Sequence, residues 1–350
     1  MKPPSEQLAL RKVVDRLGDL LTLPPSDMTL RNPPSAEVDA VANLGDLTFA
    51  IEWKGSSSLP QVSRAAEQVR QYALGLGPGV LPLVAFPFLG PVGREHCREA
   101  GVNWLDLSGN ASITAPGVRV LVQGQPNLFK QPGRPASAFA PKSSRIARWL
   151  LLHPGRSLTQ RELARATGMD EGFTSRIVSR LEHDELVIRE PDGAIRAGDP
   201  DLLLDAWRED YDFSKHQIVK GHVAARSGQA LLGQLSERLH DLSVGHAATG
   251  LAAAWLLSRF AGFRTVATYV REIPSPEVLG KLGFREDVPG ANLWLVAPND
   301  EGVFHGAGDH DGIPCVHPVQ AYLDLKEQPE RSAEAAAQLR AELLNWSTDA

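Results

Sequence analysis

The chain has 350 residues, of which 43% are hydrophobic and 22% are charged, and its formal net charge is −6. This length exceeds one ordinary domain core, so we predict two or three domains and take three as the working number. The composition excludes a bilayer-spanning segment, and the acidic total excludes a protein that coats nucleic acid over its whole surface. Because the first ten residues lack a signal-peptide core and Cys97 lies far from Cys315, we expect a reducing, cytoplasmic setting without disulfides.

The first 123 residues alternate between helical and extended patterns. Residues 5–22 repeat apolar positions every three or four residues, which predicts an amphipathic helix. We predict strands at 37–44, 47–54, 80–86, 103–107, 111–115 and 118–124, and helices at 62–75 and 92–101. This alternation predicts an α/β domain over residues 1–123.

The predicted strand LTFAIEWK has two unlike faces. Its apolar residues alternate onto one face, whereas Glu52 and Lys54 share the other. Asp39 lies on the preceding strand of the same predicted hairpin, so the fold can bring its carboxylate beside Glu52. Two carboxylates with the carbonyl of Trp53 suit a hard ion such as Mg²⁺, and a nearby lysine can help to activate water. The simpler alternative is a solvated Glu/Lys pair on an exposed strand.

This arrangement resembles the D…ExK core of PD-(D/E)xK nucleases, which have a restriction-endonuclease-like fold. The segment EQVRQY in the next helix resembles the Gln-x-x-x-Tyr motif of RecB-like members. Val38 stands where the family pattern has proline, and Glu6 is the one candidate for a companion acid on the first helix. The resemblance implies Mg²⁺ bound by Asp39 and Glu52. It implies five catalytic residues: Asp39, Glu52, Lys54, Gln68 and Tyr72.

Residues 124–142 are rich in Pro, Gly, Ser and Ala without a period, which predicts a linker. Residues 143–200 then contain three short helical patterns and two short strands around Asp192 and Gly193. Thr159 and Asp170 are predicted caps of the second and third helices, and Gly168 ends the second. Helix, helix, turn, helix and hairpin is the plan of a winged helix-turn-helix.

The basic residues gather near this module, since nine basic residues and one acidic residue lie between Arg119 and Arg165. We predict that the third helix enters the major groove and that Arg176 contacts a guanine. The other polar residues of that helix predicted to face DNA are Thr174, Ser175, Ser179 and Arg180. The predicted phosphate contacts are Arg145, Arg148, Arg161, Arg165, Arg189 and Arg196. The segment resembles MarR-like regulators, although a module for dimerisation or protein contacts is the alternative.

Residues 201–350 begin and end in helical patterns with strands between them, which predicts a second α/β domain. Four segments resemble an AbiEi-type antitoxin family: REAGVNWLDLSGNASI, HAATGLAAAWLL, ATYV and HPVQAYLDLKEQPERSAEAAAQL. In that family a nuclease-like domain is joined to a winged helix and a C-terminal domain that is distantly nucleotidyltransferase-like. The resemblance implies a regulator or antitoxin of a type IV toxin-antitoxin pair, which represses its own promoter and opposes a nucleotidyltransferase toxin.

Two further motifs contain residues of functional type but predict no ligand site. The segment HGAGDHDGIPCVH gathers six residues of metal-ligand type: His305, Asp309, His310, Asp311, Cys315 and His317. Their spacing fits no ordered zinc motif, so we do not predict a metal there. Thr249 and Gly250 are interpreted as a helix start with small residues rather than a nucleotide site.

The sequence therefore predicts a sequence-specific, double-stranded DNA-binding repressor or antitoxin, acting as a homodimer that reads two half-sites. A Mg²⁺-dependent DNA endonuclease that uses Asp39, Glu52 and Lys54 is the main alternative. A defence or competence accessory protein, whose end domains bind partners, is a third hypothesis. No cofactor other than Mg²⁺ is predicted.

Overall fold

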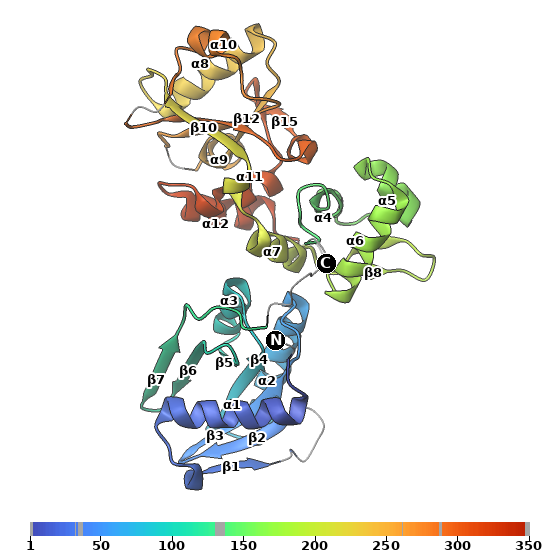
Figure 1. The fold of residues 1–350 in the computed structure, drawn as a ribbon, viewed down its shortest axis with the longest axis vertical. Coiled ribbons are helices and arrows are strands. Elements are labelled where there is room, and N and C mark those ends of the chain that lie inside the picture. Colours follow the sequence, from blue (N-terminus) through green and yellow to red (C-terminus); the bar gives the residue numbers. More distant parts are fainter. Residues whose placement is uncertain are drawn as a thin grey trace. The chain divides into compact units, whose positions relative to one another are not determined.

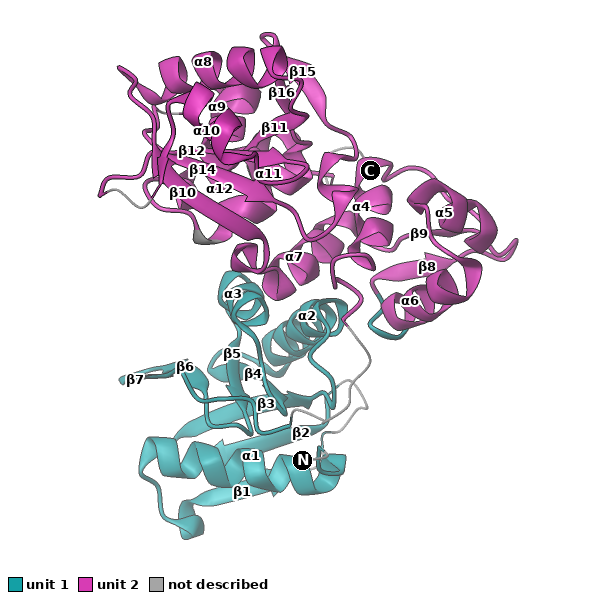
Figure 2. Ribbon diagram, turned by 45° about the horizontal axis from the view of Figure 1, so that its top comes forward, with its two compact units in different colours: residues 1–136, 183–185 teal, residues 137–182, 186–350 magenta. Residues whose placement is uncertain are grey.

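The structure is a computed structural model that describes residues 3–31, 33, 38–129, 137–260, 262–286 and 289–346. The chain divides into two compact units (Figure 2). Unit 1 comprises residues 1–136 with 183–185, and unit 2 comprises residues 137–182 with 186–350. Most of the winged-helix segment lies in unit 2 together with the C-terminal segment.

Unit 1 is built on one sheet of seven strands in the order β1-β2-β3-β4-β5-β6-β7 (Figure 1). Strands β3, β4 and β5 are parallel, and the other neighbours are antiparallel. The elements are α1 (Glu6–Leu21), η1 (Pro25–Asp27), β1 (Met28–Arg31), β2 (Ala40–Leu44), β3 (Leu47–Trp53), α2 (Leu59–Leu76), β4 (Val80–Phe86), α3 (Pro91–Glu99), β5 (Asn103–Asp106), β6 (Ala111–Ala115) and β7 (Val118–Val122). The predicted α/β domain is present.

Helices cover both faces of this sheet. Helix α1 packs with Phe49 and Ile51 of β3 in one hydrophobic cluster, whereas α2 and α3 pack with Ala50 in another. Since alternate residues of a strand point to opposite faces, Glu52 lies on the same side as Ala50, beneath α2. Strand β3 is thus an interior strand buried on both faces, not an exposed one.

Strand β1 was not predicted. It lies in PPSDMTLRNPP, pairs antiparallel with β2 and forms the edge of the sheet. A four-residue edge strand between prolines has too few residues to show alternation, and an edge strand tolerates nearby proline. Glu37, at the start of the predicted first strand, and residues 130–136 of the predicted linker lie outside the described residues.

Unit 2 begins with the predicted winged-helix elements: α4 (Ser144–Leu152), α5 (Gln160–Thr167), α6 (Glu171–His183), β8 (Val187–Arg189) and β9 (Ile195–Ala197). Thr159 forms a capping box with Glu162, and Gly168 ends α5 with φ of 66°. The Oδ1 atom of Asp170 accepts a hydrogen bond from the N–H of Phe173 at 2.7 Å. These local signals are confirmed, because each depends only on residues within one turn.

The rest of unit 2 is a second seven-stranded sheet in the order β13-β10-β14-β12-β11-β16-β15, with helices around it. Its elements are α7 (Pro200–Asp210), η2 (Phe213–Lys215), β10 (Gln217–His222), α8 (Gly228–Asp241), β11 (His246–Thr249), α9 (Gly250–Ser258), β12 (Val266–Val270), α10 (Pro276–Leu282), β13 (Arg285–Glu286), β14 (Leu293–Ala297), η3 (Glu301–Phe304), β15 (Gly308–His310), β16 (Ile313–Cys315), α11 (Pro318–Asp324), η4 (Leu325–Glu327) and α12 (Ser332–Leu343). All five residues of β12 are buried, so both faces of the sheet are covered.

One hydrophobic cluster runs through the whole of unit 2. It includes Ile146 and Leu150 of α4 together with Trp207 of α7 and Leu323 of α11. A continuous core of this kind explains why the winged-helix segment and the C-terminal segment form one compact unit. No helix in the described part of the chain is both long and apolar enough to cross a membrane.

Candidate functional sites

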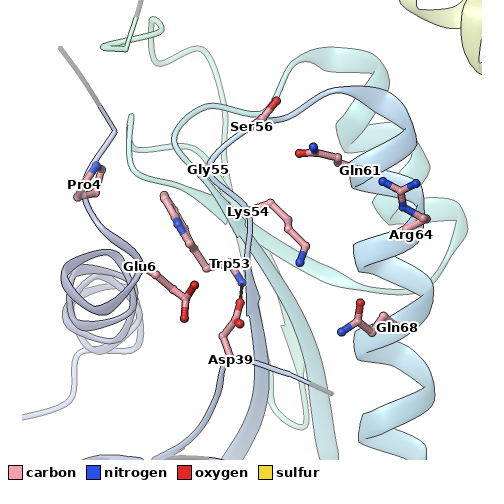
Figure 3. A pocket seen from close by; sticks show the side chains of 10 residues that line it. All are labelled: Pro4, Glu6, Asp39, Trp53, Lys54, Gly55, Ser56, Gln61, Arg64 and Gln68. Atoms are coloured by element: carbon pink, nitrogen blue, oxygen red, sulfur yellow. Dashed lines mark hydrogen bonds between the residues drawn. The ribbon is translucent and has the colours of Figure 1, made fainter. Parts of the chain in front are cut away.

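The predicted carboxylates of unit 1 are brought together by the β2–β3 pairing. Asp39 precedes β2, and its N–H donates to the carbonyl of Ile51 at 3.1 Å. Its Oδ2 atom accepts a hydrogen bond from the N–H of Trp53 at 2.8 Å, which holds the carboxylate at the end of β3 (Figure 3). The hairpin therefore places Asp39 beside the Glu52–Lys54 segment.

Glu52 is a buried carboxylate, and one of its two oxygens has no hydrogen-bond partner among the described residues. It is 2% exposed, and its Oε1 atom accepts a hydrogen bond from Nζ of Lys54 at 2.5 Å. Its Oε2 atom is buried and has no hydrogen-bond partner among the described residues. Burial raises the pKa of Glu52, the bond to Lys54 opposes that rise, and the charge of Asp39 adds to it. The alternative of a solvated Glu/Lys pair therefore fails for Glu52.

A cavity of about 650 Å³ lies beside these residues (Figure 3). Its lining includes Glu6, Asp39, Trp53, Lys54, Arg64 and Gln68. The Nζ atom of Lys54 and the amide of Gln68 both point toward its middle in Figure 3. Tyr72, one turn beyond Gln68, is not part of the lining; it is 8% exposed in the core, and its hydroxyl has no partner among the described residues.

The residues that could hold a divalent ion here are Asp39, which lines the cavity, and Glu52, which is not part of its lining. Within the described ranges, no group of three or more His, Cys, Asp or Glu side chains is placed to hold a metal. The two carboxylates and the orphaned oxygen of Glu52 are nevertheless the kind of partial ligand set that Mg²⁺ uses with several retained waters.

The predicted DNA-facing surface of α6 is only partly available. Arg176 and Ser179 are exposed, and Ser175 and Arg180 are half-buried. Thr174 is fully buried, and its hydroxyl donates to the carbonyl of Asp170 at 2.9 Å. The structure therefore corrects the prediction for Thr174, which turns toward the core of the domain and cannot reach a base in this conformation.

Phe173 supports two cations at the start of α6. The guanidinium of Arg176 lies 5.7 Å from its ring centroid, and Nζ of Lys142 lies 5.9 Å from the same centroid. Lys142 is one of the nine basic residues counted above, but it was not among the predicted DNA contacts. The tertiary structure brings it to the same surface, so it joins the DNA-contact candidates.

The predicted phosphate contacts fall into three groups. Arg165 is exposed on α5. Three others are partly or fully exposed but already pair with carboxylates: Arg161 with Glu171 at 3.1 Å, Arg189 with Glu182 at 2.8 Å and Arg196 with Glu190 at 2.5 Å. Exposed pairs of this kind contribute little to stability, so a phosphate can compete for these arginines at small cost.

Arg145 and Arg148 form the third group, and the structure corrects both predictions. Arg145 pairs with Asp300 at 2.8 Å, and only 12% of its side chain is exposed. Arg148 is 3% exposed, and its Nη2 atom donates to Oε1 of Gln320 at 2.5 Å. Both arginines lie on the face of α4 that meets the C-terminal segment of unit 2, so neither faces DNA in this conformation.

A buried polar network next to Arg148 was missed by the sequence reasoning. Asp324 is 0% exposed and accepts hydrogen bonds from four side chains. The donors are Thr249, Tyr211, Tyr269 at 3.0 Å and Gln320 at 2.7 Å. Burial raises the pKa of Asp324 to about 6 in spite of these bonds. The one sequence signal is a Gln and an Asp four residues apart within an otherwise apolar helix, HPVQAYLDL.

Residues 140–194 match a protein-family model described as the MarR family. This match and the fold define unit 2 as carrying a winged-helix DNA-binding domain. Residues 196–345 match the model described as "Transcriptional regulator, AbiEi antitoxin, Type IV TA system", so this part of the chain is similar to that family. The protein is therefore a DNA-binding transcriptional regulator of the antitoxin type.

The other two comparisons add little. No curated protein matches the chain. Among solved structures, a repair endonuclease from Pyrococcus abyssi matches with 14% identity and a TM-score of 0.24. The match covers 30% of this chain and 47% of that one, so the chain spans about half the length of the endonuclease. A likeness at this level carries no argument for the fold of unit 1.

Proposed function

We propose that α6 is the recognition helix and that the protein represses its own promoter by reading an operator there. The single observation that carries this proposal is the exposed position of Arg176 and Ser179 on α6, on a helix whose start is capped by Asp170. An exposed guanidinium on such a helix can take O6 and N7 of guanine together. The exposed ends of Arg189 and Arg196 on the β8–β9 hairpin suit the flanking phosphates.

Two further parts of the proposal follow from the family and from the geometry of operators. A dimer would place two copies of α6 about one helical turn of DNA apart, which gives a palindromic operator. Repression of a promoter shared with a nucleotidyltransferase toxin would link the protein functionally to that toxin. Such a regulator acts where the chromosome lies, so we place the protein in the cytoplasm.

The substitution Arg176→Ala tests the recognition helix. We expect the affinity of the full chain for its own upstream DNA to fall about 5- to 150-fold, because a bidentate base contact is worth roughly 1 to 3 kcal/mol. Fluorescence anisotropy at fixed salt measures this loss, with unrelated DNA of equal length measured alongside.

Arg331→Ala is the matched control. Arg331 is 57% exposed and also lies over an aromatic ring, that of Phe260 at 5.0 Å, but it belongs to the far end of unit 2 in sequence. We expect this variant to bind the operator like the unsubstituted chain. Equal operator affinity for Arg176→Ala and Arg331→Ala would show that α6 does not read the operator.

The cavity of unit 1 supports a second candidate function, metal-dependent cleavage of DNA. We propose that unit 1 has the restriction-endonuclease-like arrangement, with Asp39 and Glu52 as the residues that would hold Mg²⁺. The observation that favours it is the orphaned Oε2 atom of Glu52 next to Asp39. Mg²⁺, when bound, would supply a nucleophilic water and neutralise phosphate charge. Lys54, on the same segment as Glu52, and Gln68, on α2, would position the phosphate.

A cleavage assay separates the two functions. Supercoiled DNA that carries the upstream region is incubated with the full chain, with and without Mg²⁺. If unit 1 is a nuclease, nicking requires Mg²⁺ and is lost in Glu52→Gln, while operator affinity stays unchanged. If no Mg²⁺-dependent nicking exceeds that of Glu52→Gln, unit 1 is not a nuclease under these conditions and the regulator function stands alone.

A third part of the proposal concerns the fold of the C-terminal segment. We propose that its mixed sheet with helices on both faces is the nucleotidyltransferase-like fold implied by the family resemblance. Its most deeply buried carboxylate, Asp324, has its oxygens occupied by side-chain donors, which favours a structural role over a catalytic one.

A further inference from the structure

Two histidines of the segment HGAGDHDGIPCVH lie together with residues of the winged helix. They line a cavity of about 530 Å³ within unit 2. His305 and His317 come from the C-terminal segment, and Arg148, Trp149 and His153 come from α4 and its C-cap. The segment was set aside as a metal site because its spacing fitted no zinc motif. The structure now shows what two of its histidines surround.

Arg148 is the decisive residue of this cavity. It is 3% exposed, and its Nε and Nη1 atoms are buried without a hydrogen-bond partner among the described residues. Its guanidinium carbon lies 4.9 Å from the ring centroid of Trp207, and its Nη2 atom donates to Gln320, so Nε and Nη1 are the atoms left without a partner. No carboxylate of the described chain forms an ion pair with it. Burial lowers the pKa of Arg148, and the charges of Asp324 and Asp300 oppose this shift without pairing with it directly. A buried guanidinium without a directly paired carboxylate costs several kcal/mol.

The histidines that line the cavity add no negative charge to it. The Nδ1 atom of His317 accepts a hydrogen bond from the N–H of Val319 at 3.2 Å, so the proton of the neutral ring lies on Nε2. Burial and the charge of Arg148 lower the pKa of His317 to about 4 and lower that of His305 as well. No carboxylate lines the cavity within the described residues. A cation is therefore disfavoured and an anion is favoured.

We propose that this cavity binds the phosphate group of a small molecule, with Arg148 as its main contact and His317 and His305 as further donors. Donors that come from α4, from the start of α11 and from the residue after η3 surround the space from different elements, which suits a tetrahedral oxyanion. The ring of Trp149 and the side chain of Leu152 provide an apolar wall for the rest of the molecule. The cavity volume lies within the range of ordinary small-ligand sites.

The ligand would connect two functional parts of the chain. Arg148 belongs to α4 of the winged-helix domain, whereas His305 and His317 belong to the antitoxin-family segment. A bound phosphate replaces the missing counter-ion between them. The proposal does not depend on which residues of α6 read the operator.

Phosphorus-31 NMR on the full chain in a phosphate-free buffer tests the site with two probes, inorganic phosphate and AMP. We expect saturable broadening of the probe signal. His317→Asn should weaken binding at least about fivefold, since the asparagine oxygen can replace Nδ1 as the acceptor for Val319 while the Nε2 donor is lost. Arg148→Gln should abolish binding, and His317→Asn keeps the test valid if Arg148→Gln does not fold.

Controls separate this cavity from the DNA surface and one phosphate source from the other. Arg331→Ala should bind both probes like the unsubstituted chain. Tighter binding of AMP than of inorganic phosphate identifies a phosphomonoester ligand, and equal binding identifies free phosphate; both support the site. The proposal is overturned if neither probe binds at 20 mM, or if His317→Asn and Arg148→Gln bind the probes normally. It is also overturned if Arg176→Ala removes binding. Binding of acetate as tight as that of phosphate would overturn it as well.

Discussion

Two buried carboxylates, one in each unit, differ in how completely they are satisfied. Asp324 in unit 2 accepts from four side-chain donors, whereas Glu52 in unit 1 accepts from Lys54 and leaves Oε2 without a partner among the described residues. Burial raises the pKa of both. The comparison shows that burial alone does not distinguish a structural carboxylate from a candidate ligand. The unmet hydrogen-bonding capacity makes that distinction.

The substitution Asp324→Ala is expected to have the largest effect on the free energy of unfolding. Removal of the carboxylate leaves buried donors of Thr249, Tyr211, Tyr269 and Gln320 without their acceptor, so we expect a loss of about 3 to 5 kcal/mol in the free energy of unfolding. Urea unfolding followed by tryptophan fluorescence measures it. A loss below about 1 kcal/mol would show that the network is not structural, and the contrast with Glu52 would disappear.

The next largest effect should be a change with pH in the stability of Asp324→Asn relative to the unsubstituted chain. The pKa of Asp324 is about 6 in the folded protein, above its ordinary value of about 4 in an unfolded chain. The folded state therefore holds this proton more tightly, and the contribution of Asp324 to stability falls as pH rises from about 4 to about 6. The variant lacks this fall, so its stability relative to the unsubstituted chain should rise by about 3 kcal/mol across that window.

The titration of buried histidines does not affect the difference in stability between Asp324→Asn and the unsubstituted chain. Burial lowers the pKa of His216 and of His317 to about 4, so these groups favour stability as pH rises over the same range. They are present in both proteins and cancel in the difference. A difference that does not change between pH 4 and pH 6.5 would mean that Asp324 titrates at its ordinary value.

The smallest effect on stability is expected from Glu52→Gln. The substitution removes a buried charge whose second oxygen has no partner, and Lys54 is 35% exposed and can be hydrated. We therefore expect a change within about 1 kcal/mol at pH 7.5. Mg²⁺ should raise the melting temperature of the unsubstituted chain and not that of the variant. A loss above 2 kcal/mol would instead make Glu52 a structural carboxylate like Asp324.

Local sequence determined much of the winged helix. The caps at Thr159 and Asp170, the end of α5 at Gly168 and the hairpin at Gly193 were all predicted, because each needs only neighbours in the chain. Of the predicted site residues in unit 1, Asp39, Lys54 and Gln68 line one cavity, since strand pairing and helix position follow from short segments. Strand β1 was missed because four residues between prolines carry no period.

Tertiary structure alone decided which polar side chains are covered. Sequence assigned Arg145, Arg148 and Thr174 to DNA, yet α4 turns both arginines toward the C-terminal segment, and Thr174 faces the domain core. The burial of a side chain depends on which distant segment packs over its helix face. The charge of a residue does not predict which segment that will be. The same packing leaves Arg148 with unsatisfied N–H groups beside two distant histidines, and so creates a site that the sequence did not predict.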